Sequence, residues 1–571
     1  MRNIFIITTA ISAILLYGCQ NFLEEAPQGV VSDSDLNTPE NIEKMVISAY
    51  SALGNEAQVT SNSLWQMGSI RSGDAHKGGD GLGDYIAWHD YETFVTNRPD
   101  NESTNNMWIQ WYIAVGRIND ALRRVNQAEE SAYPQKTGRQ AELRFLRAHF
   151  YFMLKIVYKY IPYIDETIPK EQYETISNRE YSSDELWTKI ADDLRFSADN
   201  LPGSQTDRGR PDKFAAKAYL AKTLLYQAYT QDEQHQVTGI DQGKLNEVNN
   251  LCAELLGSNY SLFDDFGKNF LSQYENGVES VFAVQYSHDD GTPLGRFDMG
   301  HAVNFTMNPE FGCCGFHVPT QNMINAFKTG ADGLPMFSDY DKTEAREGSD
   351  FQIQSFDPRL DHTIAIPGHP FKYAPDVIFE RSWTRAPAIY GAYASMKELV
   401  PVGDPSFVKR HPYMSSSKNW AVIRFADILL WKAEALIELG RQEEALPLIN
   451  RIRERALNST AMLKRADGLP VSTYRADIYK PGVNCTWTQG FAREALRWER
   501  RLEFAMEGYR LFDLIRWGIA ADYLNAYFAG ESKRKPYLAT ASFQKGRDEY
   551  LPIPLNQVNY SKGLYVQNNK W

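Results

Sequence analysis

Apolar residues recur every three or four positions over two long parts of this 571-residue chain, about residues 38–257 and 420–571. That spacing places them on one face of an α-helix, so both parts predict a series of amphipathic helices. One such stripe consists of Met107, Trp111, Ala114, Ile118, Ala121, Leu122 and Val125. A helix with a single apolar face must bury it against a neighbour, and the stripes follow one another in antiparallel-looking pairs. The pattern therefore predicts a mostly α-helical protein.

Residues 267–419 interrupt this pattern. Glycine, proline, histidine and aromatic residues crowd together there, the alternation over residues 278–286 is typical of a strand, and a short helix is expected near residues 320–327. We interpret the segment as a loop-rich insertion with short strands. Ligand-binding residues are often carried by loops on a rigid scaffold, so we expect the ligand side of the protein here.

The block KAEALIELGRQEEALPLINRIRERA, residues 432–456, resembles a tetratricopeptide unit. Small residues stand where two helices would approach closely, and Gly440 stands where a left-handed residue would end the first helix. Small-residue stripes also occur in ordinary helix packing, so this block alone leaves a repeat origin open.

The N-terminus has the layout of a secretory signal peptide. A short positive start is followed by an apolar run over residues 4–16 and then by Gly18-Cys19. A small residue before cysteine resembles the lipobox of a bacterial lipoprotein, which predicts a signal peptide over residues 1–18 and lipidation of Cys19. The alternative is an ordinary signal peptide with an incidental cysteine. The run is too short for a transmembrane helix, which needs about 20 residues.

Four of the five cysteines lie beyond Cys19, namely Cys252, Cys313, Cys314 and Cys485. So few cysteines in an exported chain of this length do not make a disulfide scaffold, and the fold must depend on its core. The adjacent Cys313 and Cys314 could form a vicinal disulfide or remain two thiols, and the sequence leaves both open.

Several functional classes are disfavoured. The formal net charge of −12 argues against a nucleic-acid partner. We find no HExxH, Gly-x-Ser-x-Gly, P-loop or dinucleotide-binding motif, and no Cys/His spacing typical of zinc. The residues therefore indicate no cofactor or metal site and carry no recognised catalytic motif.

Aromatic residues make up 13% of the chain, and aromatic rings in loops would suit a sugar-binding surface. We predict two loop regions for ligand contact. The glycine-rich residues 61–101 would supply Asp74 and His76 as partners of hydroxyl groups and Trp88 as a stacking plane. The insertion would supply Phe316, His317, Trp383 and Tyr390. The alternative for each residue is ordinary loop packing.

The C-terminal block REALRWERRLEFAMEGYRLFDLIRW, residues 493–517, places acids and arginines at helical spacing, which predicts an ion-pair lattice along a helix. The block resembles the signature of the SusD/RagB family of glycan-capturing lipoproteins. Further segments resemble other parts of that family in the same order: CQNFLEEAP from Cys19, RFLRAHFYFMLKIVYKYIPYI from Arg144, FADILLWKAEALIELG from Phe425 and EYLPIPLNQV from Glu549. Residues 267–419 match poorly apart from GFHVPTQNMINAF.

The resemblance implies a scaffold of about four tetratricopeptide-like helix pairs, with irregular loops carrying the ligand site. It implies a non-catalytic lipoprotein that is held on the outer membrane by its lipid, faces the cell exterior, captures oligosaccharides or polysaccharides and delivers them to a SusC-like TonB-dependent transporter. Residues 19–571 would then form one SusD-like domain. The alternatives are a surface-anchored glycoside hydrolase or lyase, a lid that handles peptide cargo, and a structural lid that recognises only its transporter.

Overall fold

The structure is a computed structural model that describes residues 36–571, except residues 55–60, 293–294, 347 and 411–412. The predicted signal peptide and Cys19 lie outside the described residues. Among the described helices, none is both long enough and apolar enough to cross a membrane.

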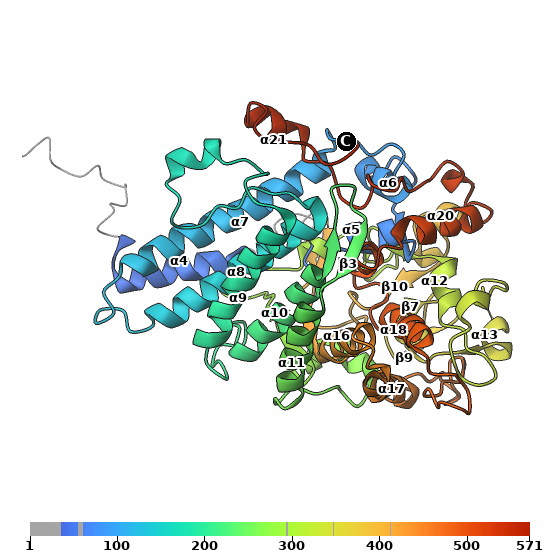
Figure 1. Ribbon diagram of the computed structural model, residues 1–571. Coiled ribbons are helices and arrows are strands. Elements are labelled where there is room, and N and C mark those ends of the chain that lie inside the picture. The colour runs from blue at the N-terminus through green and yellow to red at the C-terminus, as the bar shows by residue number, and fades with distance from the viewer. Residues whose placement is uncertain (1–35, 55–60, 293–294, 347, 411–412) are drawn as a thin grey trace, which may run out of the picture.

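Four successive helix pairs form the scaffold of the described chain, and each pair packs against the next (Figure 1). The helices are α4 (Pro39–Ser51), α7 (Glu102–Gln127), α8 (Lys136–Tyr158), α9 (Ser183–Asn200), α10 (Lys213–Ala228), α11 (Gln242–Leu256), α16 (Phe425–Glu438) and α17 (Gln442–Asn458). This arrangement confirms the mostly α-helical fold with about four helix pairs that the sequence predicted.

Local signals set several helix ends. The Thr38 side chain accepts a hydrogen bond from the backbone N–H of Asn41 at 3.3 Å and so caps α4. At α9, Ser182 and Glu185 form a capping box. Gly440 follows α16 with a φ of +77°, the left-handed conformation expected of it.

The strands pair two by two. The pairs are β1 (Ala75–Gly78) with β5 (Phe316–Pro319), β2 (Tyr229–Gln231) with β3 (Val237–Ile240), β4 (Ser280–Val284) with β13 (Trp420–Arg424), β6 (Ser355–Phe356) with β14 (Thr473–Tyr474), β7 (Ile364–Ala365) with β10 (Ala394–Ser395), β8 (Pro370–Phe371) with β9 (Ala374–Ile378), and β11 (Phe407–Arg410) with β12 (Tyr413–Ser416). Only β6 and β14 run parallel within this described set. The insertion therefore contains the short strands that were predicted.

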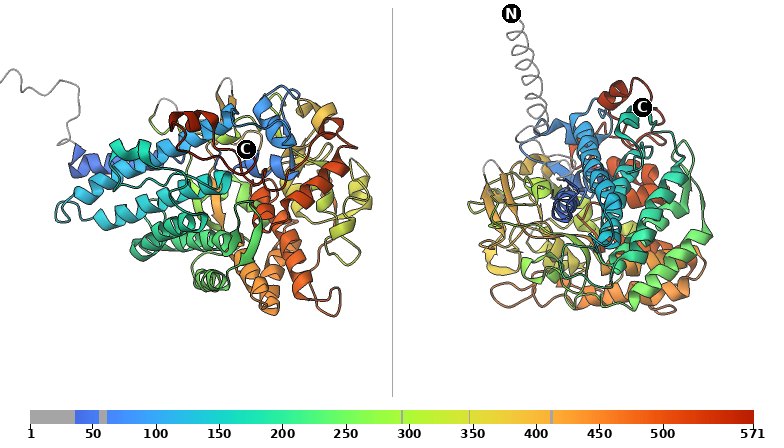
Figure 2. Two further views of the ribbon diagram at one scale, coloured as in Figure 1. Left: turned by 45° about the horizontal axis from the view of Figure 1, so that its top comes forward. Right: turned by 90° about the vertical axis from the view of Figure 1, so that its left-hand side faces the viewer.

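Short helices complete the side of the molecule away from α7–α11, as the two views of Figure 2 also show. They are α5 (Trp65–Gly68), α6 (Ile86–Thr93), α12 (Gln321–Ala326), α13 (Asp350–Ile353), α14 (Arg359–Thr363), α15 (Pro387–Tyr390) and α20 (Ala520–Glu531). The short helix α21 (Leu555–Tyr560) lies instead against α7. One apolar cluster runs from the scaffold helices into the glycine-rich loop, where it includes Trp65 and Trp88, and into the insertion, where it includes Phe316. The loops are thus anchored to the helical core.

The single helix expected over residues 493–517 is two helices, α18 (Gln489–Glu503) and α19 (Arg510–Arg516). Between them, Gly508 has a φ of +84°, and a Cβ there would lie 1.7 Å from the carbonyl oxygen of Ser63. A side chain at this position would collide with the backbone of a distant loop. Tertiary packing therefore interrupts the helical pattern.

The acids of α18 pair mainly with cations from other segments rather than along the helix. Glu503 accepts hydrogen bonds from Arg424 at 2.9 Å, from Arg455 at 2.5 Å and from Arg359 at 3.1 Å. Burial opposes ionisation of Glu503, but the surrounding arginine charges outweigh it and lower the pKa of this carboxyl. The predicted lattice is therefore corrected: it is largely a buried cross-link between α18, the second scaffold part and the insertion.

Candidate functional site

The β1–β5 pair joins the two regions that the sequence indicated as ligand contacts. His76 lies opposite Val318 and Gly78 lies opposite Phe316 in the register. One residue beyond, the N–H of Gly79 donates to the carbonyl oxygen of Gly315 at 2.9 Å. Although more than two hundred residues separate them in the sequence, the glycine-rich loop and the insertion form one continuous surface.

Lys77 holds the loop that follows β1. Its ammonium group donates to the carbonyl oxygens of Gly78 at 3.0 Å and Gly81 at 2.9 Å, and also to that of Asp84. The side chain is buried, and this burial lowers the pKa of Lys77 to about 8. One buried cation thus satisfies three backbone carbonyls and fixes residues 78–84 in one conformation.

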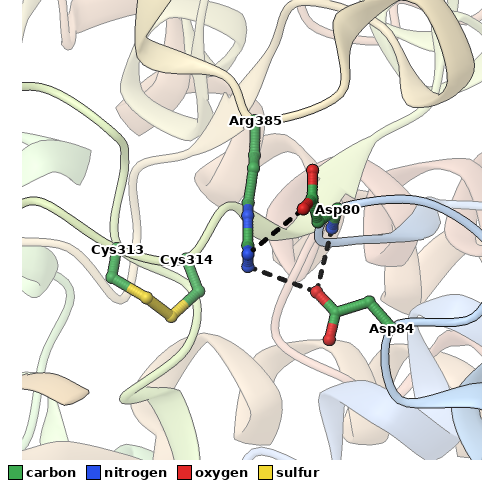
Figure 3. The surroundings of a disulfide bond; sticks show 5 residues. All are labelled: Asp80, Asp84, Cys313, Cys314 and Arg385. Carbon is green, nitrogen blue, oxygen red and sulfur yellow. Dashed lines mark hydrogen bonds and ion pairs between the residues drawn. A yellow bond between two sulfur atoms is a disulfide. The ribbon is translucent and has the colours of Figure 1, made fainter. Parts of the chain in front are cut away.

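A charged triad lies on the surface of this loop (Figure 3). Arg385 from the insertion reaches Asp84 with Nη1–Oδ2 at 3.2 Å and Asp80 with Nη2–Oδ2 at 3.5 Å. The backbone N–H of Asp80 also donates to Asp84 at 2.9 Å. The side chains of Asp80, Asp84 and Arg385 are 65%, 27% and 31% exposed, so the triad can meet solvent and ligand.

Cys313 and Cys314 form a disulfide beside this triad (Figure 3). The sequence left both a disulfide and two thiols open, and the structure has the disulfide. Cys313 is partly exposed and Cys314 is buried. Cys252 and Cys485 are free.

An aromatic layer supports the loop from beneath. Tyr85 stacks on Trp88 with ring centroids 4.2 Å apart, and Phe316 meets both rings edge-on at 5.5 and 5.4 Å. Trp88 is wholly buried and Phe316 is 3% exposed, whereas Tyr85 is only partly buried. The prediction that Trp88 and Phe316 face the ligand is therefore corrected, because Tyr85 covers the indole.

Asp74 and His76 are also buried, which corrects their predicted role as direct partners of ligand hydroxyls. Asp74 pairs with Arg501 at 3.1 Å. His76 bonds to Glu92 at 2.9 Å and to Tyr537 at 2.9 Å. Burial acts to lower the pKa of His76, but contacts with the carboxylates of Glu531 and Glu92 outweigh it and raise that pKa.

The remaining predicted residues divide between core and surface. His317 is buried and bonds to Glu398 through Nδ1 at 2.7 Å, and Tyr390 is buried beside the Lys77 ammonium group. Neither faces solvent, so these two predictions are corrected as well. Trp383 is partly exposed and packs edge-on against Phe379 at 5.4 Å. Of the predicted contact residues, Trp383 is the one that can still touch a ligand directly.

Sequence reasoning did not select Asp80, Asp84, Tyr85 or Arg385 as site residues. Asp80 and Asp84 flank two glycines in the predicted loop, which is a signal for an exposed polar turn. Nothing in the sequence points to Arg385, because it stands 301 residues from its partner Asp84.

The arrangement offers hydrogen-bond donors and acceptors together with an aromatic face. The guanidinium donates and the carboxylates accept, and Tyr85 adds a ring that a sugar's C–H groups could cover. Within the described part of the chain, no three His, Cys, Asp or Glu residues are grouped so that they could hold a metal ion.

Two family models match this chain, and several known proteins are similar to it. A family model described as the SusD family matches residues 278–571, and one described as starch-binding associating with outer membrane matches residues 21–225. A SusD-like protein P25 of Formosa agariphila is 22% identical over 96% of this chain and 95% of that protein. A SusD-like protein of Bacteroides ovatus is 24% identical over 90% of this chain and 82% of that protein.

Solved structures share the fold. A SusD-like protein from Bacteroides fragilis has a TM-score of 0.70 at 22% identity, covering 96% of this chain and 100% of its own. Surface glycan-binding protein A from Bacteroides thetaiotaomicron, solved in complex with laminarihexaose, has a TM-score of 0.67 at 21% identity, covering 93% and 100%.

Proposed function

This chain belongs to the SusD family, and from that premise we propose that it is a cell-surface glycan-binding lipoprotein. It captures oligosaccharides and delivers them, uncleaved, to a SusC-like TonB-dependent transporter in the outer membrane. The structural relative that binds laminarihexaose supports a carbohydrate as the ligand class. The family description that refers to the outer membrane supports that location.

The observation that carries the proposal is the partly exposed triad of Arg385, Asp80 and Asp84 beside the ring of Tyr85. Sugar hydroxyls both donate and accept hydrogen bonds, so they can bridge a guanidinium and two carboxylates. Lys77 and the buried aromatic layer hold these groups in place before the ligand arrives, which reduces the entropy lost on binding. Trp383 extends the same surface.

The triad favours binding over hydrolysis. A glycoside hydrolase needs two separated carboxyl groups, one of which donates a proton to the leaving group. Here one guanidinium bonds to both carboxylates, so the two carboxyl groups are held together by a shared partner and are not set apart across a cleft. Peptide cargo is the alternative that the same donors and acceptors would permit.

The test is the affinity of purified protein for a panel of polysaccharides and oligosaccharides, including laminarin and starch, measured by affinity electrophoresis and calorimetry. We expect Arg385→Ala to weaken binding at least about tenfold, a loss of about 1.4 kcal/mol. The matched control is Arg98→Ala, which removes a 73% exposed arginine paired with Asp100. It should bind as the wild type does.

Reducing ends are measured in the same incubations. Released sugar would overturn the non-catalytic proposal in favour of a hydrolase or lyase. Wild-type protein that binds no glycan in the panel would overturn carbohydrate as the ligand class. If Arg385→Ala bound glycans as tightly as the wild type, the triad would not be part of the binding site.

A further inference from the structure

A second groove lies well away from the triad, against the scaffold helix α7. A cavity of about 340 Å³ opens between α7, the 3-10 helix η3 (Lys170–Thr175) and the C-terminal segment that contains α21. Its aromatic lining includes Trp108, Tyr112, Tyr560 and Tyr565. Neither the predicted contact residues nor the triad reaches this groove.

The exposure of the aromatic rings rises from the floor of the groove to its rim. Trp108 is 3% exposed and forms the floor, with the ring of Tyr112 at 5.0 Å and that of Tyr565 at 6.1 Å. Tyr560 stands at the rim and is 70% exposed. The ring of Tyr560 is therefore open to a ligand that enters the groove.

Hydrogen bonds fix the walls. The Tyr112 hydroxyl donates to the carbonyl oxygen of Pro162 at 2.7 Å. The Gln557 side chain of α21 donates to Asn105 of α7 at 2.9 Å, which holds the C-terminal segment against the helix. The groove is therefore formed before any ligand enters it.

Two features of the lining indicate the chemistry of the occupant. The indole of Trp108 lies at the groove floor, where its side chain is 3% exposed. The lining carries one charged side chain, Glu174, at its exposed edge. An uncharged ligand with an acceptor for the indole and donors for the carboxylate would complement this lining.

We propose that this groove is a second carbohydrate site, which holds a neutral sugar unit against the tyrosine rings. The inference rests on the proposed function, because it takes the same ligand class to a different place. A sugar hydroxyl accepts from the Trp108 indole, and others donate to Glu174 and bond to the Tyr560 hydroxyl.

The position of the groove suits a long glycan. The N–H of Leu555, the first residue of α21, donates to Pro99, which lies in the connection between α6 and α7. Helices α21 and α6 lie along the same edge of the molecule (Figures 1 and 2). The loop with Asp80 and Asp84 directly precedes α6. One polysaccharide chain could therefore meet both sites and gain avidity.

Gly116 of α7 provides a clean way to block the groove. It lines the cavity, and a Cβ added there would meet nothing within 4 Å. Leucine favours helices, so Gly116→Leu should fold normally while its side chain fills the space beside the rings. Gly138→Leu is the matched control, because Gly138 of α8 is equally open and lies away from the groove.

The experiment is calorimetry with short oligosaccharides and affinity electrophoresis with the parent polysaccharides, using wild type, Gly116→Leu, Tyr560→Ala, Gly138→Leu and Arg385→Ala. We expect two oligosaccharides per wild-type protein and one per Gly116→Leu protein. Gly116→Leu and Tyr560→Ala should weaken polysaccharide binding about tenfold, whereas Gly138→Leu should not.

The outcomes separate the two proposals. One oligosaccharide per wild-type protein, with no effect of Gly116→Leu on either ligand, would overturn the groove site and leave the proposed function standing. If glycan binding survived in Arg385→Ala but was lost in the double variant Arg385→Ala/Gly116→Leu, the result would support the groove site. No glycan binding by wild type would overturn both.

Discussion

Arg501 of α18 donates hydrogen bonds from Nε and Nη2 to Oδ1 of Asp74, at 3.2 and 3.1 Å, across 427 residues of sequence. Both side chains are buried. The pair ties the glycine-rich loop, at the residue that precedes β1, to the C-terminal helix α18. Asp74 therefore anchors the start of β1, which leads into the loop that carries the proposed site.

Removing one partner of the Arg501–Asp74 pair should destabilise the folded protein. We expect Asp74→Ala to lower the free energy of unfolding by about 3–5 kcal/mol, because it leaves the Arg501 charge buried and unpaired. Urea unfolding monitored by circular dichroism measures the change. The control is Asp100→Ala, whose pair with Arg98 is mostly exposed and should contribute no more than about 1 kcal/mol. If both variants lost the same free energy of unfolding, the buried pair would stabilise the fold no more than the exposed one.

Lys77→Met should loosen the ligand loop. The substitution leaves the carbonyl oxygens that Lys77 now satisfies without their donor, at a cost of about 1–3 kcal/mol. We expect weaker glycan binding and faster proteolysis within residues 78–85. Lys44→Met is the control, since Lys44 is exposed and bonds only to side chains of its own helix. If Lys77→Met left both the glycan affinity and the rate of proteolysis unchanged, Lys77 would not be what holds this loop in place.

Glu398 should make stability depend on acid pH. Burial opposes its ionisation, but the charge of His317 outweighs burial and lowers the pKa of Glu398 from 4.5 to about 2. Because the folded-state pKa is the lower one, this stabilisation is complete above about pH 4.5 and is lost as the pH falls towards 2. The stabilisation amounts to about 3–4 kcal/mol, at about 1.4 kcal/mol for each pKa unit.

The measurement is urea unfolding of wild type and Glu398→Gln between pH 6 and pH 3. The gap between the two free energies of unfolding should be widest at the higher pH and should narrow towards the lower one. A gap that stays constant across this range would mean that Glu398 does not titrate as described.

The predicted lipidation of Cys19 is tested separately from ligand binding. Cys19→Ala cells should incorporate no labelled palmitate into this protein and should lose it from the outer-membrane fraction, because the acyl chains supply the anchor. The soluble variant should bind the same glycans with unchanged affinity, since every proposed contact lies beyond residue 61. Membrane retention of the variant would contradict the lipid anchor.

The helical scaffold was open to prediction because its signals are local. The cap at Thr38 and the left-handed Gly440 each act within one or two turns of a helix. The predicted strand over residues 278–286 became β4, and the predicted helix near residues 320–327 became α12. Residues 493–517 departed from their pattern because Gly508 packs against Ser63, a contact that no local spacing records.

The sequence selected the two loops that carry the proposed site but not the side chains of its triad. Glycine and aromatic content selected two regions that the β1–β5 pair joins, a contact that the sequence did not predict. The same content could not tell a buried ring from an exposed one. Trp88 and Tyr85 stand three residues apart, and their stacking puts the first in the core and leaves the second at the surface.

The sequence by itself determined the helix pairs, the position of the insertion and the resemblance to a family, because hydrophobic periodicity, caps and motifs are properties of short stretches of chain. Tertiary structure alone decided which polar groups meet. Arg385 reaches Asp84 and Arg501 reaches Asp74 only after the fold closes loops of hundreds of residues. Burial then assigns each charge its role, since a desolvated ion must be paired, whereas an exposed one stays available to a ligand.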